Sequence, residues 1–263
     1  MREVKAYWLF RWLRHPQALV GAAALCLCIG AVQGLVRTVR QQPISGGEAP
    51  YIQRIAAAQH PRVSCSLRPC LALTFDDGPN ATVTPQILDI LARQQVKATF
   101  FVIGIHVPGR EEILRREYRE GHEIGNHSWN HPDLSKLSPE DAQTQIALTQ
   151  KVIAGAGVPA PKLLRPPYGA VNDMLAAHNK LTIVRWNTDP EDWKQTDPAK
   201  TDAQLLAQAR PGAVILMHDI YPSTVAALEP AIQALKQQYQ FVTASELLEV
   251  SPGDQGQFFA RYR

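Results

Sequence analysis

Residues 71–79, Leu-Ala-Leu-Thr-Phe-Asp-Asp-Gly-Pro, constrain the fold of this chain more than any other stretch. The apolar run 71–75 is short and ends in turn residues, which is typical of a buried strand in a parallel sheet. Asp76 and Asp77 close this strand, and Gly78-Pro79 then turns the backbone. Two adjacent carboxylates at the end of a buried strand are costly to desolvate, and a bound cation is the simplest group that offsets their charge. The alternative is that Asp76 caps the turn while Asp77 points to water.

Short apolar runs alternate with helical patterns through residues 67–250. Strands are expected at residues 71–75, 97–103, 122–126, 163–164, 182–186, 213–217 and 241–243. Helices are expected at residues 84–91, 111–120, 138–154, 171–179, 202–209 and 224–237, with a last short helix capped by Ser245. Such alternation favours a parallel sheet with helical crossovers. The predicted fold is therefore α/β, a distorted (β/α) barrel of about seven parallel strands.

An N-terminal transmembrane or signal-anchor helix is expected within residues 1–40. Residues 18–36 are apolar apart from Gln33 and the glycines, which is near the minimum length for a membrane-spanning helix. Because basic residues precede this run, the positive-inside rule places the N-terminus in the cytoplasm and the remaining chain across the membrane. The alternative is a cleaved signal peptide and a secreted product, since small residues are frequent at residues 30–34.

The rest of the chain divides into a linker at residues 41–66, one domain at residues 67–250 and a loose tail at residues 251–263. Six basic residues and one acid precede residue 41, which leaves 21 basic and 23 acidic residues beyond it. This balance does not support a basic groove for nucleic acid. Cys65 and Cys70 lie just before the first strand. If the domain is exported, a small disulfide between them is expected, and two free thiols are the alternative.

Polar residues collect where the predicted strands end. Asp76 and Asp77 follow the first strand, His127 and His131 the third, Arg165 and Tyr168 the fourth, Asp189, Asp192 and Trp193 the fifth, and His218 the strand before the last long helix. In a β/α barrel these strand ends face one mouth, where active sites form. Five loops that deliver such groups to one face indicate a functional site. No role is assigned to several histidines outside these groups, among them His60, His106, His122 and His178.

His127 and His131 are four residues apart, a spacing that suits a shared metal ion. Pro132 disfavours the αR conformation at His131, so this segment is expected to be more loop than helix. With a carboxylate from Asp76 or Asp77, the pair becomes a two-histidine, one-carboxylate set, which serves hydrolytic zinc and also non-haem iron oxygenases. The doubled aspartate favours hydrolysis, because one carboxylate binds the metal while its neighbour takes a proton from water.

Five short motifs occur in a fixed order. They are Thr74-Phe-Asp-Asp-Gly78, His127-Ser-x-x-His131, Arg165-Pro-Pro-Tyr-Gly169, Asp189-x-x-Asp192-Trp193 and Leu216-x-His218. Together they resemble the five motifs of the polysaccharide deacetylases, the NodB-homology domain of carbohydrate esterase family 4. The resemblance covers about residues 71–248, and no core position of the motifs departs from the family pattern.

The resemblance implies a divalent metal, usually Zn²⁺ with Co²⁺ or Ni²⁺ as alternatives, bound by Asp77, His127 and His131. Asp76 resembles the general base, and Arg165 resembles the residue that orients it. A guanidinium beside Asp76 should also keep that carboxylate ionised.

The same resemblance implies that His218 is the general acid and that Asp192 is its partner. The backbone N–H of Tyr168 would help hold the oxyanion. The acetyl methyl group would contact a pocket lined by Trp193, Leu216 and Pro167. Asp189 either belongs to the site or only shapes its loop.

The implied function is hydrolysis of N-acetyl groups from a polysaccharide that contains N-acetylglucosamine, such as peptidoglycan, poly-N-acetylglucosamine or a chitin-like chain. The expected partners are this N-acetylated polysaccharide and, through the N-terminal segment, the cytoplasmic membrane, with the domain on its outer side. Three alternatives are an O-acetyl esterase, a non-catalytic envelope carbohydrate-binding relative and an iron oxygenase. Intact Asp76 and His218 argue against the binding protein, and no basic clamp for an oxo-acid is evident for the oxygenase.

Overall fold

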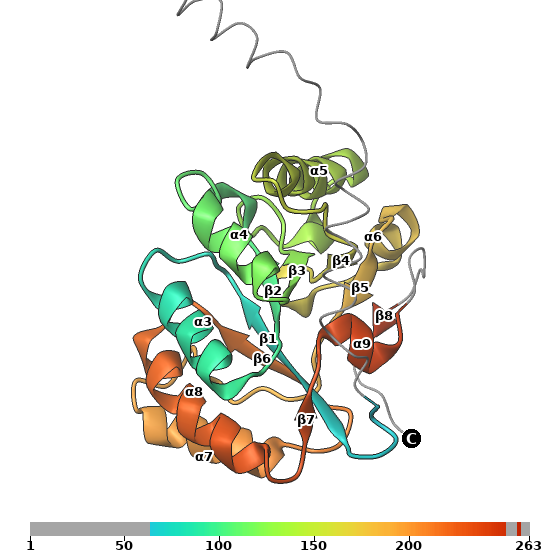
Figure 1. Ribbon diagram of the computed structural model, residues 1–263. Coiled ribbons are helices and arrows are strands. Elements are labelled where there is room, and N and C mark those ends of the chain that lie inside the picture. Colours follow the sequence, from blue (N-terminus) through green and yellow to red (C-terminus); the bar gives the residue numbers. More distant parts are fainter. Residues whose placement is uncertain (1–63, 251–256, 259–263) are drawn as a thin grey trace, which may run out of the picture. The chain divides into compact units, whose positions relative to one another are not determined.

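The computed structural model describes residues 64–250 and 257–258, which Figure 1 draws in colour. The chain divides into two units, Met1–Pro61 and Arg62–Arg263, and the described residues belong to the second. The predicted transmembrane or signal segment and most of the predicted linker lie outside the described residues. Among the helices in the described ranges, none has the length and apolar character needed to cross a bilayer.

The described strands pair only in parallel. They are β1 (Cys70–Asp76), β2 (Thr99–Val102), β3 (Glu123–Asn126), β4 (Leu163–Leu164), β5 (Thr182–Val184), β6 (Val214–His218), β7 (Gln240–Phe241) and β8 (Gln257–Phe258). Their order is β6-β1-β2-β3-β4-β5-β8, while β7 pairs with the first residues of β1. The predicted parallel α/β fold is therefore confirmed, as a sheet that curls into a half-barrel.

The chain that follows β5 extends this curl toward β6. Thr188 forms an isolated parallel bridge with Ile215, and the Leu216 N–H donates a hydrogen bond to the Thr188 carbonyl oxygen at 2.9 Å. Just before it, the Asn187 N–H donates to the Val214 carbonyl oxygen at 3.2 Å. These bonds place the loop after β5 beside the first residues of β6, the strand that ends at His218.

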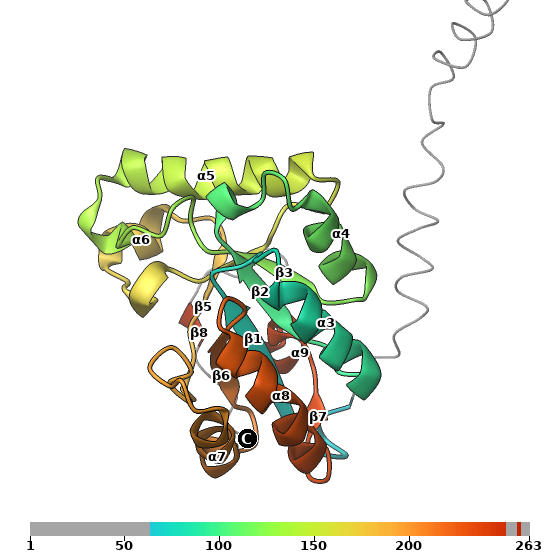
Figure 2. The same ribbon diagram turned by 90° about the vertical axis from the view of Figure 1, so that its left-hand side faces the viewer.

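Helices follow most of the strands. They are α3 (Val83–Gln94), α4 (Glu111–Arg119), α5 (Pro139–Gly155), α6 (Asp173–His178), α7 (Pro198–Gln208), α8 (Pro222–Leu235) and α9 (Ala244–Leu248). Figures 1 and 2 show that α8 packs against both α3 and α7.

The starts of α7 and α9 differ from the prediction in ways that their capping residues explain. Helix α7 begins at Pro198, before the predicted residue 202, because Asp197 caps it and proline suits the first turn. Helix α9 is capped by Thr243 within a capping box, so the prediction of Ser245 as the cap is wrong. Ser138 caps α5, as predicted.

Strand β1 is buried along its whole length. Residues 71, 73 and 75 belong to the apolar cluster that β1 shares with α3 and α8, whereas Cys70 and Ala72 belong to a second cluster that includes residues of β5 and α9. Successive side chains point to opposite faces of a strand, so both faces of β1 are covered. This explains the uninterrupted apolar sequence. It also means that Asp76, at the end of the strand, is buried.

The predicted loose tail is wrong at two residues. Gln257–Phe258 forms strand β8, which pairs with β5, and the Arg185 N–H donates to the Phe258 carbonyl oxygen at 2.8 Å. Phe258 also packs against the apolar cluster of Val184 and Val242. This long-range packing orders a segment whose local sequence gives no strand signal.

A disulfide joins Cys65 and Cys70, as one of the two sequence-based interpretations expected. Cys70 is buried at the start of β1, and Cys65 packs against the same apolar cluster as Ala72. The bond therefore fixes the chain at the entry to the central strand.

Glu117 of α4 is an acid at a fully buried position. Neither carboxylate oxygen has a hydrogen-bond partner among the described residues. Burial, and secondarily the charge of Asp219, raises the pKa of Glu117 well above its ordinary value. The folded protein therefore holds a proton that the unfolded chain releases, so this group's contribution to stability is present below the ordinary carboxyl pKa and is lost as pH rises above it.

Replacing Glu117 with methionine is expected to stabilise the protein. Removing an unpaired buried carboxyl should raise the free energy of unfolding by about 1–3 kcal/mol, with a larger gain at mildly alkaline than at mildly acidic pH. Urea unfolding at two pH values measures this effect. A Glu112→Met variant, at an exposed position of the same helix, is the control and should give no gain. A destabilised Glu117→Met protein would contradict the expectation.

Candidate active site

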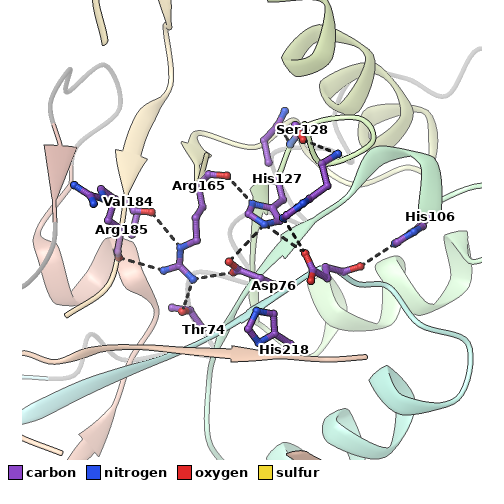
Figure 3. A network of polar contacts seen from close by, with 12 residues as sticks. Thr74, Asp76, His106, His127, Ser128, Arg165, Val184, Arg185 and His218 are labelled. Carbon is purple, nitrogen blue, oxygen red and sulfur yellow. Dashed lines mark hydrogen bonds and ion pairs between the residues drawn. The ribbon is translucent and has the colours of Figure 1, made fainter. Parts of the chain in front are cut away.

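The polar residues predicted to share one face do meet at the carboxyl ends of the strands. Asp76 ends β1 and stands in register with His218 at the end of β6. His127 directly follows β3, and Arg165 directly follows β4. Figure 3 shows these side chains converging from the four strands. The convergence follows from the parallel topology, because parallel strands present the same end at one edge of a sheet.

Asp77, His127 and His131 form a group that could hold a metal ion. Asp77 Oδ1 lies 3.5 Å from Nε2 of both histidines, and the three candidate ligand atoms all lie within 4.8 Å of one another. Asp77 Oδ1 is buried and has no hydrogen-bond partner within residues 64–250 and 257–258. A buried carboxylate oxygen between two imidazole nitrogens is the arrangement that a bound cation satisfies.

The backbone of the two loops that carry these ligands is left-handed at three residues. The φ angles are 77° at Asp77, 68° at Ser128 and 62° at His131. The loop is held by a hydrogen bond from the His131 N–H to Ser128 Oγ at 3.1 Å. The segment between the two histidines is therefore a loop, as Pro132 predicted, and not a turn of helix.

His127 presents Nε2 toward Asp77 because its other nitrogen is occupied. Its Nδ1 donates a hydrogen bond to the Arg165 carbonyl oxygen at 2.6 Å, which leaves the lone pair on Nε2. Burial lowers the pKa of His127 to about 3, against the opposing charge of Asp77. The ring is therefore neutral near neutral pH, as a metal ligand must be.

Asp76 is held beside this group by Arg165. Arg165 Nη1 donates to Asp76 Oδ1 at 2.8 Å, and Asp76 Oδ2 lies 3.6 Å from His127 Nε2. Burial raises the pKa of Asp76 above its ordinary value, while the charge and hydrogen bond of Arg165 lower it. Arg165 thus acts in the predicted direction, but burial outweighs it in the metal-free protein.

Arg165 is itself fully buried and is fixed by several acceptors. Besides Asp76, its guanidinium donates to Thr74 Oγ1 at 2.7 Å, to the Val184 carbonyl oxygen at 3.1 Å and to the Arg185 carbonyl oxygen at 3.3 Å. Its guanidinium carbon also lies 4.1 Å from the centroid of the Phe101 ring. These contacts leave the guanidinium one orientation, and that orientation determines where Asp76 points.

His218 is paired with Asp192. The His218 Nδ1 lies 2.7 Å from Asp192 Oδ1, and the His218 backbone N–H donates to Asp192 Oδ2 at 2.8 Å. Thr224 Oγ1 also donates to Asp192 Oδ2 at 2.6 Å. Burial lowers the pKa of His218, but the hydrogen bond and charge of Asp192, with the charges of Asp76 and Asp77, outweigh it and raise the pKa to about 9.

Among the predicted pocket residues, Pro167 follows β4 and Trp193 follows β5, whereas Leu216 lies within β6. Tyr168 has a φ of 61°, and its ring stands edge-on to His131 with 4.7 Å between centroids. Trp193, next to Asp192, is 48% exposed, so it is not a core residue. Leu216 and Pro167 are buried. Asp189 instead shapes its loop, because its Oδ1 accepts a hydrogen bond from the Glu191 N–H at 2.8 Å.

Comparisons with known proteins decide the family. The family model for polysaccharide deacetylase matches residues 64–185. The solved structure of the peptidoglycan deacetylase PdaC from Bacillus subtilis is similar to this chain with a TM-score of 0.67 and 45% sequence identity, over 69% of this chain and 91% of the solved PdaC chain. The chain belongs to the polysaccharide deacetylase family.

Two other members show the range of this deacetylase family. The peptidoglycan-N-acetylglucosamine deacetylase PgdA of Listeria monocytogenes is 47% identical over 178 residues, which cover 67% of this chain and 38% of PgdA. The chain therefore matches less than half of the length of that relative. A family 4 acetyl xylan esterase from Clostridium thermocellum, solved with a cobalt ion, has a TM-score of 0.68 and 36% identity, over 73% of this chain and 98% of the esterase.

One residue that contacts the candidate site of this deacetylase family member, His106, has no predicted role. His106 follows β2, and its Nδ1 lies 2.8 Å from the carbonyl oxygen of Asp77. His106 follows a strand as the other polar groups of the site do, but it belongs to none of the five motifs.

Replacing Asp192 with asparagine is expected to lower the pKa of His218 by at least about 1 unit, because an adjacent negative charge is lost. In the parent protein the pKa of His218 is raised to about 9, so its contribution to stability is complete below the ordinary histidine pKa and is lost as pH rises through about 9. NMR titration of the His218 ring in the metal-free protein measures both values. An unchanged pKa in the variant would contradict the pairing.

Proposed function

We propose that this chain is a metal-dependent deacetylase that removes N-acetyl groups from a polysaccharide containing N-acetylglucosamine. One observation carries the proposal. The Asp77, His127 and His131 set lies beside two separately oriented groups, Asp76 on Arg165 and His218 on Asp192. A metal set alone serves many reactions, but a carboxylate base and an imidazole acid next to it suit hydrolysis of an amide.

The residues present fit a divalent cation. The unpartnered Asp77 Oδ1 and the neutral His127 ring give a mixed oxygen and nitrogen donor set, which suits Zn²⁺ and also Co²⁺ or Ni²⁺. When bound there, such an ion supplies Lewis acidity and lowers the pKa of a bound water to about 7. His131 is partly exposed, so the set is reachable from solvent.

Asp76 is proposed as the general base. Arg165 occupies Oδ1, so Oδ2 remains to accept the proton of the attacking water. Because Arg165 is immobilised by its other acceptors, the carboxylate needs no reorientation before it takes the proton. The buried Arg165 charge also favours the ionised form that a base requires.

His218 is proposed as the general acid. Asp192 holds its Nδ1–H, which leaves Nε2 to give a proton to the departing amine. With a pKa raised to about 9, the ring is protonated near neutral pH. This proton matters because an amine cannot leave as an amide anion.

The remaining predicted residues are proposed to bind the acetyl group. In the described part of the chain, the Tyr168 N–H donates no backbone hydrogen bond, so it is free to donate to the oxyanion. Leu216 lies two residues before His218 on β6 and therefore on the same face of the strand. With Trp193 and Pro167, it would line the space for the acetyl methyl group.

An O-acetyl esterase is the second candidate, because a family member of this architecture is an acetyl xylan esterase. Acetate release from a panel of peptidoglycan, N-acetylglucosamine oligomers, poly-N-acetylglucosamine and acetylated xylan tests both. We expect release from the N-acetylated glycans, loss of release after chelation and recovery with added Zn²⁺. Release from acetylated xylan alone would favour the esterase, and release that survives complete metal removal would exclude both metal-dependent reactions.

The proposed location is the outer side of the cytoplasmic membrane, with residues 18–36 as anchor and a secreted form as the alternative. The disulfide between Cys65 and Cys70 supports an oxidising compartment. Carbonate extraction of membranes from expressing cells tests the anchor, since an anchored protein stays in the pellet and a secreted one appears in the medium.

A further inference from the structure

A short turn after β2 connects the two loops that supply the candidate metal ligands. This turn, η1, comprises Gly104–His106. The Gly104 N–H donates to the Ser128 carbonyl oxygen at 3.0 Å, and the Ile105 N–H donates to the Trp129 carbonyl oxygen at 2.9 Å. Both acceptors lie between His127 and His131. The turn is thus bonded directly to the histidine loop.

The same turn reaches the aspartate loop through a side chain. His106 Nδ1 lies 2.8 Å from the carbonyl oxygen of Asp77. Figure 3 draws this contact as the dashed line that ends at His106. A carbonyl oxygen only accepts hydrogen bonds, so Nδ1 must carry the proton. Directly before the turn, the Ile103 N–H donates to the Gly78 carbonyl oxygen at 3.0 Å. Two successive peptide groups of the aspartate loop are therefore held by Ile103 and by η1.

The backbone conformation of Asp77 requires support from neighbouring groups. Its φ of 77° is a conformation that residues with a side chain rarely adopt and that persists only when neighbouring groups impose it. Rotation of the Asp77 peptide would turn the carboxylate away from the histidines, whose Nε2 atoms lie 3.5 Å from Oδ1. A hydrogen bond to the Asp77 carbonyl oxygen opposes that rotation.

The turn that carries His106 is itself tightly packed. A side chain at Gly104 would meet Thr149 Oγ1 and the Trp129 ring, each at 2.6 Å from its Cβ. The His106 carbonyl oxygen also accepts a hydrogen bond from Arg110 Nη1 at 2.9 Å. A donor mounted on such a turn has little freedom, so it can hold the Asp77 peptide in one orientation.

We propose that His106 is a positioning residue for the metal site, which it preorganises by fixing the Asp77 peptide through its Nδ1–H. The inference rests on the proposed function, because it takes Asp77 as a metal ligand. His106 itself does not bind the metal: its nitrogen is directed at the main chain of Asp77, and its role is to keep Asp77 Oδ1 between the two imidazoles.

Metal affinity of His106 variants tests this role. Removing a residue that orients a metal ligand typically weakens binding by about 10–100-fold, and this loss is expected for His106→Leu in a Zn²⁺ competition titration. His106→Asn should bind Zn²⁺ with an affinity within a few-fold of the parent protein, because its amide N–H₂ takes the place of Nδ1–H. The visible spectrum of the Co²⁺-loaded His106→Leu protein should differ from that of the parent protein, whereas the spectrum of His106→Asn should match it.

The chain provides a matched control. His178 of α6 also bonds a main-chain carbonyl oxygen through Nδ1, that of Met174 at 2.9 Å, but it is exposed and lies outside the site. His178→Leu should leave Zn²⁺ affinity unchanged. Equal affinity of His106→Leu and the parent protein would overturn the inference, whereas a parent protein that binds no metal would instead overturn the proposed function.

A measurement on the unmodified protein covers the case in which His106→Leu does not fold. Nitrogen-15 NMR of the histidine rings distinguishes the two neutral tautomers, and His106 is expected as Nδ1–H both without metal and with Zn²⁺ bound. An Nε2–H tautomer in either state would overturn the proposed hydrogen bond.

Discussion

An Asp76→Asn variant is expected to release acetate about 10²–10⁴-fold more slowly than the parent protein while still binding one divalent metal ion per chain. The amide keeps the shape of the carboxylate and an oxygen for Arg165, but it cannot take a proton from water. The metal remains because Asp77, His127 and His131 are unchanged. Single-turnover acetate release and metal analysis of the same preparation measure the two effects separately.

This variant also leaves the buried Arg165 guanidinium without its counter-charge, which costs about 3–5 kcal/mol of stability in comparable sites. The rates must therefore be compared at a temperature where thermal unfolding shows both proteins folded. Asp173→Asn, an exposed carboxylate at the start of α6, is the control and should keep the parent rate. A rate for Asp76→Asn within tenfold of the parent would show that Asp76 is not the base.

A His218→Gln variant is expected to lose about 10²–10⁴-fold in amide hydrolysis but far less on an aryl acetate ester. An amine needs a proton to leave, whereas a phenolate leaves without one. The ratio of the two rates isolates the acid role, because a general loss of folding or metal would reduce both reactions alike. Equal losses on the two substrates would contradict this assignment.

The pH dependence of the parent protein follows from the same assignment. An acid must be protonated to act, so amide hydrolysis should fall as pH rises through the pKa of His218, which is raised to about 9 without metal. A bound cation offsets the charge of Asp77, one of the groups that raise this pKa, so the alkaline limb of the metal-loaded protein lies at or below that value. The rate of aryl ester hydrolysis should not fall as pH rises through the pKa of His218, because that reaction needs no proton from the acid.

The sequence alone predicted where the site lies, because parallel strands bring their carboxyl ends to one edge. Asp76, Asp77, His127 and Arg165 could be found by this rule without coordinates. The left-handed backbone at Asp77 and His131 could not, since neither residue is glycine. His106 follows a strand as these groups do, but it belongs to none of the five motifs, and its contact with the main chain of Asp77 is evident only in the structure.

Long-range contacts also explain the errors in the fold. Strand β8 has only two residues, and its pairing with β5 rather than its own sequence defines it. The sequence predicts a helix over residues 111–120, and only the packing of α4 shows that Glu117 within it is buried. The start of α7, by contrast, was predictable, since Asp197-Pro198 is a common start of a helix.

The central claim is that one divalent ion is bound by Asp77, His127 and His131 beside Asp76. Anomalous diffraction from zinc-loaded crystals, collected at the zinc absorption edge, tests it most directly. We expect one strong peak per chain at about 2.0–2.2 Å from a carboxylate oxygen of Asp77 and from Nε2 of both histidines. A fully loaded crystal whose only peak lies elsewhere, or which shows none, would contradict the account.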